Sequence, residues 1–200
     1  MTPTATAATL SAAFAAILVG SCAVAAETEP AEPEFLITGD ALGPIHMGMT
    51  MEELIAAMPD ATIEHEPYFS GEIAEAECIV IDGERVACVT LYPPFDGSSD
   101  VPVIDYIFTA SPRARTAEGV GPGTPLADAE AAYGEATAQI SIIESREYVE
   151  FADHPHSLSF RIGALDEDVW RAGIYDNDDD SHGSKTSTFR DDAVVMFVEF

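Results

Sequence analysis

The stretch Gly48-Met-Thr-Met-Glu-Glu-Leu-Ile-Ala-Ala-Met-Pro-Asp-Ala-Thr62 contains a complete set of helix signals. Thr50 and Glu53 have the spacing of a capping box, in which each side chain binds the backbone N–H of the other residue. Apolar residues recur at helical spacing from Met51 to Met58, and Pro59 blocks continuation. The stretch therefore predicts a short amphipathic helix.

A second stretch, Gly123-Thr-Pro-Leu-Ala-Asp-Ala-Glu-Ala-Ala-Tyr-Gly-Glu-Ala-Thr137, aligns with the first without gaps. Thr124 is the expected N-cap, Pro125 suits the first helical position, and Gly134 is a typical helix end. The apolar side of this second predicted helix consists of Leu126, Ala129 and Tyr133.

Short segments bounded by turn residues follow each helix and predict antiparallel strands. The clearest alternation runs from Leu158 to Ile162, where Leu158, Phe160 and Ile162 point to one side and Ser159 and Arg161 to the other. The expected strands are residues 61–68, 75–81, 85–92, 103–109, 136–143, 147–152, 157–162, 168–175 and 193–200.

These signals predict an α+β fold of two tandem repeats, each a short helix plus a four-stranded antiparallel meander, with the helices packed on one sheet face. Residues 35–110 are the first expected repeat and residues 111–200 the second, with Ser111–Gly119 as their junction. The two sheets are either separate or joined into one. Val194–Val198 is apolar on both faces, which predicts a central strand or a strand covered on both sides.

The beginning of the chain predicts export. Residues 1–26 contain no charged side chain, and Leu10–Val19 has the length of a signal-peptide core but is too short to cross a bilayer. Cleavage after the small residues Ala23–Ala26 gives a soluble product, whereas a lipobox ending at Cys22 gives a lipid-anchored one. Residues 27–34 then form an acidic, proline-containing linker. We expect a periplasmic, outer-membrane-anchored or secreted protein.

The charge of the chain excludes some classes of partner. It contains 36 acidic and 8 Lys or Arg residues, for a net charge of −28, and every acidic residue follows residue 26. This field repels nucleic acids and anionic lipid headgroups, so we expect membrane contact only through a lipid on Cys22. A cationic partner is one reason for such acidity, and a solvated surface suited to salt is the interpretation that we favour.

Cys78 and Cys88 flank a hairpin signal. Two β-rich segments surround Asp82-Gly83, a dipeptide typical of tight hairpin turns. A turn centred near Gly83 places the two cysteines opposite one another, and an exported protein meets oxidising conditions, so we predict a disulfide between them. A metal site is the alternative, but no His or Cys lies close by in sequence to complete one.

No strong catalytic or metal motif is present, and we predict no catalytic residue, metal ligand or cofactor-binding residue. His65-Glu66 begins like a zinc-protease helix, but Pro67 follows it. The acidic run Asp176–Gly183 lacks the glycine and glutamate of a calcium-binding EF-hand loop, so we favour a solvated loop.

Three further groups of side chains invite a functional interpretation that we weigh against a structural one. His154-Pro155-His156 suits a surface turn better than a metal site. A serine nucleophile, Ser157 beside His156 or Ser181 beside His182, would need geometry that sequence neighbours rarely provide. An aromatic binding surface is the functional interpretation of the third group, although such residues are more often core. Its members would be Trp170, Tyr148 and Phe160.

The predicted repeat resembles β-lactamase inhibitory protein, in which two tandem units each place helices on a four-stranded sheet. Gly48–Leu54 also resembles the Gly-Met-Thr helix start of the small lipoproteins of the outer-membrane barrel-assembly machinery. A third resemblance, over roughly residues 36–175, is to uncharacterised exported bacterial proteins with tandem helix-plus-sheet repeats. It rests on Gly-Pro-Ile-His-Met-Gly-Met-Thr at residues 43–50 and Thr-Ala-Glu-Gly-Val-Gly-Pro-Gly at residues 116–123. These motifs are helix caps, so they imply a fold and no activity.

Export, a repeat-built sheet and the absence of a catalytic motif together predict a non-enzymatic protein-binding or envelope-associated module with an unknown protein partner. A secreted inhibitor of a hydrolase is the alternative, by analogy with the inhibitory protein. An envelope hydrolase is the third hypothesis, and it requires a pocket lined with perturbed titratable groups.

Overall fold

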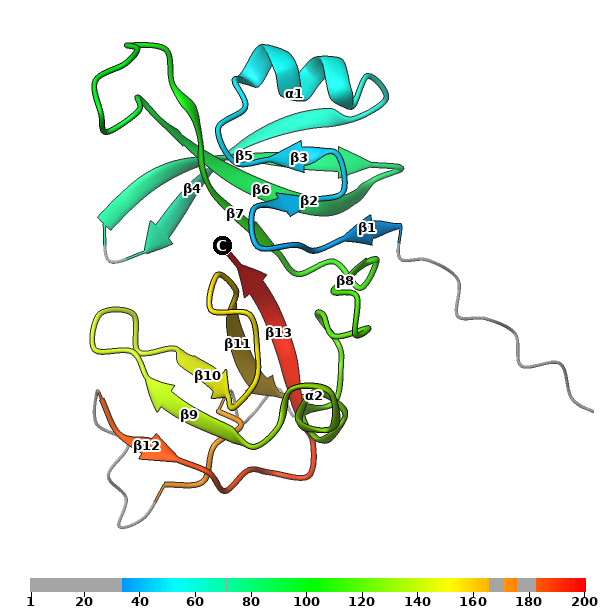
Figure 1. The fold of residues 1–200 in the computed structure, drawn as a ribbon, viewed down its shortest axis with the longest axis vertical. Helices are drawn as coiled ribbons and strands as arrows, with labels where there is room; N and C mark the ends of the chain where they lie inside the picture. Colours follow the sequence, from blue (N-terminus) through cyan, green and yellow to red (C-terminus); the bar gives the residue numbers. More distant parts are fainter. Residues whose placement is uncertain (1–33, 71, 166–170, 176–182) are drawn as a thin grey trace, which may run out of the picture. The chain divides into compact units, whose positions relative to one another are not determined.

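The computed structural model describes residues 34–70, 72–165, 171–175 and 183–200. Nine strands form one antiparallel sheet in these residues: β4 (Thr62–Ser70), β5 (Glu72–Ile81), β6 (Glu84–Tyr92), β7 (Val103–Thr109), β9 (Ala136–Ile140), β10 (Glu147–Phe151), β11 (Ser159–Ala164), β12 (Lys185–Thr186) and β13 (Ala193–Glu199). Their order across the sheet is β12-β9-β10-β11-β13-β7-β6-β5-β4 (Figure 1). Four two-residue strands pair outside it, β1 (Phe35–Leu36) with β8 (Ala114–Arg115), and β2 (Ala41–Leu42) with β3 (Ile45–His46).

Helix α1 (Met51–Ala57) begins with the predicted capping box, which is confirmed. The Thr50 hydroxyl accepts a hydrogen bond from the Glu53 backbone N–H at 3.3 Å, and the Glu53 carboxylate accepts one from the Thr50 backbone N–H at 2.9 Å. These bonds favour the ionised carboxylate and lower the pKa of Glu53. Leu54 is the one buried side chain of the helix, so α1 covers little of the sheet.

Helix α2 (Leu126–Tyr133) buries the predicted apolar side, Leu126, Ala129 and Tyr133, and ends at Gly134 as predicted. Its predicted N-cap, Thr124, is wrong, because the helix begins one residue later and Pro125 occupies the cap position without a side-chain bond. The Thr124 hydroxyl instead accepts the backbone N–H of Gly121 at 3.0 Å. The carbonyl of Thr124 accepts the N–H of Val195 at 2.9 Å, which fastens the helix start to β13.

The predicted fold class, two tandem repeats of a helix plus a four-stranded meander with helices packed on one sheet face, is wrong. The described part of the chain is mostly β, and nine of its strands form a single sheet. The last strand of the second predicted meander, residues 168–175, lies partly outside the described residues, and residues 171–175 form only an isolated bridge at Gly173. Strand β13 takes that place beside β11. Helices of seven and eight residues are too short to cover so wide a sheet.

Strand β13 joins the two halves of the sheet, so of the two predicted alternatives, a central strand is the one found. Val198 and Glu199 pair with β7, and Ile107 and Phe200 exchange two backbone hydrogen bonds of 2.8 and 3.0 Å. The Glu199 carboxylate, 2% exposed, accepts the Tyr106 hydroxyl at 2.7 Å and the Arg161 guanidinium at 3.3 Å. One buried carboxylate therefore connects β7, β13 and β11.

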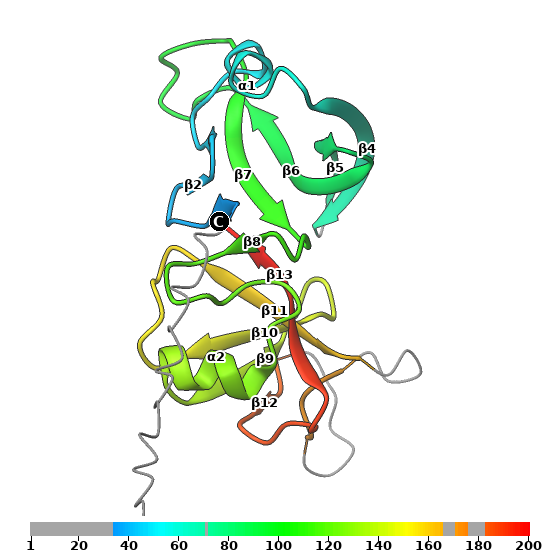
Figure 2. The same ribbon diagram turned by 90° about the vertical axis from the view of Figure 1, so that its right-hand side faces the viewer.

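The main core lies on the opposite face of the sheet, where short segments as well as helices supply apolar side chains. The first strands contribute Phe35, Leu42 and Ile45, and Figure 2 shows β2 alongside β7. The predicted alternation in β11 is confirmed, since Phe160 and Ile162 are buried in this core and Arg161 points the other way.

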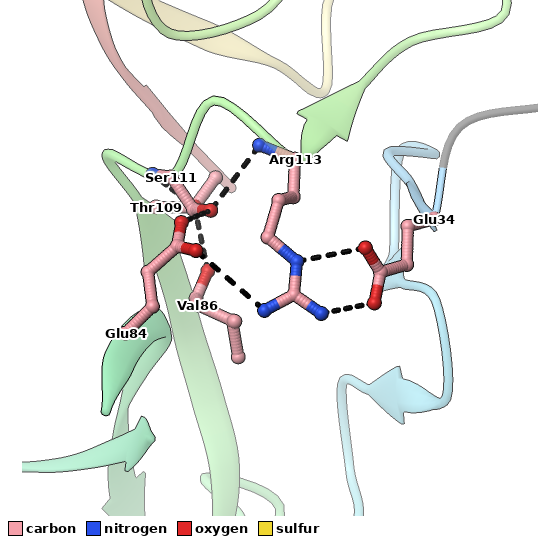
Figure 3. A network of polar contacts seen from close by, with 6 residues as sticks. All are labelled: Glu34, Glu84, Val86, Thr109, Ser111 and Arg113. Carbon is pink, nitrogen blue, oxygen red and sulfur yellow. Dashed lines mark hydrogen bonds and ion pairs between the residues drawn. The ribbon is translucent and has the colours of Figure 1, made fainter. Parts of the chain in front are cut away.

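An arginine fastens the first described residues to the connection between β7 and β8 (Figure 3). The Arg113 guanidinium donates two hydrogen bonds to the Glu34 carboxylate, lies 3.7 Å from a Glu84 oxygen and stacks over the Phe35 ring. The Ser111 hydroxyl donates to Glu84 at 2.8 Å. The bonds from Arg113 lower the pKa of Glu34. Glu34 is thus the one residue of the predicted linker whose contacts are described.

The predicted signal peptide at residues 1–26, with Cys22, lies outside the described residues, as does the linker up to residue 33. Neither helix found in the described part of the chain has the length and apolarity needed to cross a bilayer.

Cys78 on β5 and Cys88 on β6 lie directly opposite one another and form a disulfide. The turn between the strands has positive φ at both Asp82 and Gly83, as a two-residue hairpin turn requires. The disulfide lies on the face away from the main core, in a small cluster with Ala76 and Phe108.

We expect the double substitution Cys78→Ala and Cys88→Ala to lower the free energy of unfolding by about 2–3 kcal/mol, because the bond closes a short loop in the unfolded chain. Urea unfolding of the oxidised protein measures this change. A reducing agent should destabilise the wild type and leave the double variant unchanged. Two reactive thiols at Cys78 and Cys88 in the folded protein, purified without reductant, would show that the bond does not form.

Candidate functional site

The open face of β9, β10 and β11 carries the polar side chains of these strands. Side chains alternate between the two faces of a strand, so burial of Ala138 and Val149 in the core places Thr137, Gln139 and Tyr148 on the other side. No helix of the described residues packs on this side of β10 in Figures 1 and 2. This face is therefore where a ligand or a partner has access to the sheet.

Two adjoining pockets share Tyr148 and Glu150 as lining residues, the first on this face and the second at the end of β10. The first has a volume of about 280 Å³ and lies over β9, β10 and β12. The second, of about 400 Å³, lies over β10 and the turn that follows it. The first is lined by Thr137, Gln139, Ser141, Ile142, Tyr148, Glu150 and Lys185, and the second by Tyr148, Val149, Glu150, Phe151, His154, His156, Leu158 and Ser159.

Lys185 brings a positive charge to the first pocket. It is the only lysine in the sequence, and the pairing of β12 with β9 places it beside Gln139. Gln139 in turn pairs with Tyr148 on β10, so the three residues form one row across the sheet. Lys185 forms no ion pair with the residues that the structure describes.

Tyr148 separates the two pockets and is held in place by its hydroxyl, which donates to the Glu144 carboxylate at 2.8 Å. Burial of the phenol raises the pKa of Tyr148 well above its usual range, and the Glu199 carboxylate adds to the shift. The phenol is consequently a hydrogen-bond donor at neutral pH. Glu144 also accepts a hydrogen bond from Arg146 at 3.1 Å, so Tyr148, Glu144 and Arg146 form one hydrogen-bonded network.

The two histidines of the second pocket lie in the turn that the sequence predicts. Nδ1 of His154 is 2.8 Å from the backbone carbonyl of Phe151, and its ring contacts the rings of Phe151 and Phe160 edge-on. The centre of the His156 ring lies 5.8 Å away. His154 is thereby engaged in holding the turn. The described residues contain no group of three or more His, Cys, Asp or Glu side chains that could hold a metal ion.

Glu147 lies on the core side of β10 and anchors a neighbouring segment. Its carboxylate, 2% exposed, accepts the backbone N–H groups of Ala172 and Gly173 at 2.5 and 3.0 Å and the Tyr175 hydroxyl at 2.7 Å. Burial, and then the bond to Glu147, raise the pKa of Tyr175. These bonds satisfy a buried charge and hold residues 171–175 against the sheet.

Of the two described members of the predicted aromatic surface, Tyr148 lies on the open face and Phe160 does not. Phe160 is fully buried in the core, and Trp170 lies outside the described residues. Residues 176–182 of the acidic run lie outside them too, with Ser181 and His182. The alternation of side chains along β10 could have placed Tyr148 on the open face. The sequence did not predict a role for Lys185, Glu147 or Glu199. The uniqueness of Lys185 was the one signal that could have singled it out.

We expect Gly173→Ala to release the segment that Glu147 holds. An added Cβ would lie 2.7 Å from the Glu147 carboxylate oxygen and 2.7 Å from Thr186 Cγ2, closer than non-bonded atoms approach. The free energy of unfolding should fall by about 1–3 kcal/mol, because a buried carboxylate loses partners. Hydrogen exchange should accelerate at residues 172–175. Unchanged exchange there would show that Glu147 does not anchor the segment.

Comparison with known proteins identifies the fold and no function. No protein-family model and no curated protein matches the chain. Among solved structures, the chain is similar to the uncharacterised protein yfeY from Escherichia coli, with a TM-score of 0.50 and 11% sequence identity. The likeness covers 82% of this chain and 98% of yfeY. At this identity, the similarity extends to the fold alone.

Proposed function

We propose that this chain is an exported, non-enzymatic binding module of the cell envelope, which docks a protein partner with a basic surface. The support is the loop between β9 and β10, at the edge of the open face. Ile142 and Ile143 are neighbours in this loop and are 68% and 66% exposed. Adjacent exposed isoleucines beside a pocketed sheet face are suitable anchors for a partner.

The loop is held in one conformation by its own hydrogen bonds. The Ser141 hydroxyl accepts the backbone N–H groups of Ile143 and Glu144, each at 3.2 Å. The backbone of Ser141 bonds that of Ser145 at 3.2 Å and that of Arg146 at 2.8 Å. A loop ordered before binding loses less conformational entropy when a partner docks, which favours affinity.

The net negative charge of the chain favours a partner with a positively charged surface. A net charge of −28 repels acidic proteins and accelerates encounter with basic ones. Apolar contact at the two isoleucines then supplies the short-range part of the binding energy. The proposed partner therefore carries a basic surface around an apolar pocket or groove.

We expect Ile143→Ser to weaken capture of a specific basic protein from envelope extracts at least ~10-fold, because it removes an apolar anchor that the partner would cover. Ile55→Ser is the matched control, since Ile55 on α1 is also exposed, at 51%, and lies elsewhere. Quantitative pull-down with each variant, at low and high salt, measures the effect. Equal capture by both variants, or capture that salt leaves unchanged, would refute the proposed interface.

A secreted inhibitor of a hydrolase is the second candidate, and one observation favours it. Phe95 is 95% exposed in the connection between β6 and β7. A turn holds this connection, with the Gly97 N–H bonded to the Pro94 carbonyl at 3.0 Å and the Asp96 carboxylate bonded to the Ser98 N–H at 2.9 Å. A fixed loop that presents an aromatic side chain suits insertion into the active site of an enzyme.

For this second candidate we expect direct inhibition of a secreted or envelope hydrolase, with the inhibition constant rising at least ~10-fold in Phe95→Ala. A panel of purified hydrolases, assayed with the wild type and this variant, provides the measurement. Tyr92→Ala is the control, because Tyr92 is also exposed, at 49%, at the end of β6. Absence of inhibition across the panel would favour the envelope-binding proposal.

A further inference from the structure

The first pocket on the open face has features that the docking of a protein does not require. It holds about 280 Å³, just below the volume of sites for drug-sized ligands. Its lining residues come from β9, β10, β12 and the loop after β9, so paired strands fix most of its shape. This size suits a ligand as small as an amino acid or a dipeptide.

Two opposite charges line the pocket without neutralising one another. Lys185 and Glu150 both face into it, and neither forms an ion pair with the described residues. Five of the chain's arginines, by contrast, do form ion pairs with carboxylates. As far as the described residues go, the only lysine is therefore available to an anionic group of a ligand, and Glu150 to a cationic one.

The sheet register sets the separation of these two charges. Lys185 pairs with Gln139, and Thr137, two residues along β9, pairs with Glu150. The two charged residues are thus two strands apart, roughly 10 Å across the sheet, and about 7 Å apart along it. Their side chains can extend toward each other over the pocket and leave room for a small ligand between them.

The remaining lining offers apolar contact and a free amide. Ile142, which is largely exposed, and Tyr148 both line the pocket and offer apolar contact. The Thr137 and Ser187 hydroxyls form a hydrogen bond of 3.1 Å with one another, and the Ser141 hydroxyl accepts a backbone N–H of its own loop. Gln139 has no side-chain hydrogen bond to the described residues, so its amide can donate to a ligand and accept from it.

The net charge of the chain decides which kind of ligand can use both charges. A simple anion attracted by Lys185 must approach through the field of a chain with a charge of −28, which repels it. A simple cation leaves Lys185 unpaired beside it. A zwitterion has no net charge, so the field does not oppose its approach, and each end meets its opposite in the pocket.

We propose that this pocket binds a zwitterionic amino acid or short peptide with an apolar side chain. Lys185 receives the carboxylate, Glu150 receives the ammonium group, and the side chain lies against Ile142 and Tyr148. The inference goes beyond the proposed function, because it assigns a small-ligand site beside the loop that docks the protein partner. It involves binding alone, with no bond made or broken.

Calorimetric titration of the exported protein with glycyl-L-leucine tests the site. We expect saturable binding, weakened at least ~10-fold by Lys185→Met and likewise by Glu150→Gln. Glu52→Gln, a charge change at an exposed position of α1, is the control and should leave binding unchanged. N-acetylglycyl-L-leucine, which lacks the ammonium group, and glycyl-L-leucinamide, which lacks the carboxylate, should each bind at least ~10-fold more weakly.

Several outcomes would overturn the inference. These are no saturable binding of the dipeptide, equal binding of the amide, or equal binding by Lys185→Met and wild type. All variants lie at exposed positions, and circular dichroism verifies that each is folded. The protein-docking proposal is tested separately through Ile143, which does not line the pocket. Loss of dipeptide binding with partner capture intact removes the small-ligand site alone.

Discussion

The pairing of β13 with β7 is the constraint on which the rest of the structure depends. Only Val198 and Glu199 pair in register with β7, yet this contact makes two groups of strands into one sheet. Without it, the ends of β7 and β13 would expose unpaired backbone groups, at a cost comparable to lost hydrogen bonds. Glu199 also could not remain buried, because its carboxylate needs Tyr106 on β7 and Arg161 on β11 at the same time.

A continuous sheet determines where function can lie. One face is filled by the core, to which the two short helices and the strands β1, β2 and β3 contribute. Over β9–β11 the other face keeps its polar side chains and the first pocket. The edge of the sheet formed by β4 is unsuited to pairing with another chain, because β4 carries Glu64 and Glu66 and its Pro67 lacks an N–H. Binding is therefore expected over the pocketed face and its loops.

Local signals in the sequence predicted the individual helices and strands, but they did not predict which distant strands pair with one another. The capping box of Thr50 and the tight turn at Gly83 depend on residues a few positions apart, so the sequence was sufficient. The place of β13 between β11 and β7 depends on contacts with distant strands, and an apolar segment does not specify its neighbours. In the site, Lys185 lies on a two-residue strand too short for any periodic pattern, and only its pairing with Gln139 brings it to the pocket.

The arginines and the single lysine have different places in this structure: Arg113 and Arg161 join strands, whereas Lys185 lines the first pocket. Arg113 and Arg161 each bind a carboxylate and stack on an aromatic ring, which the flat guanidinium does well and an ammonium group does poorly. In a chain with 36 acidic residues, such pairs position strands at the points where they join. Lys185 has no comparable partner among the described residues. A flexible ammonium group at a pocket suits a ligand that arrives and leaves, because it neutralises charge without demanding a fixed geometry.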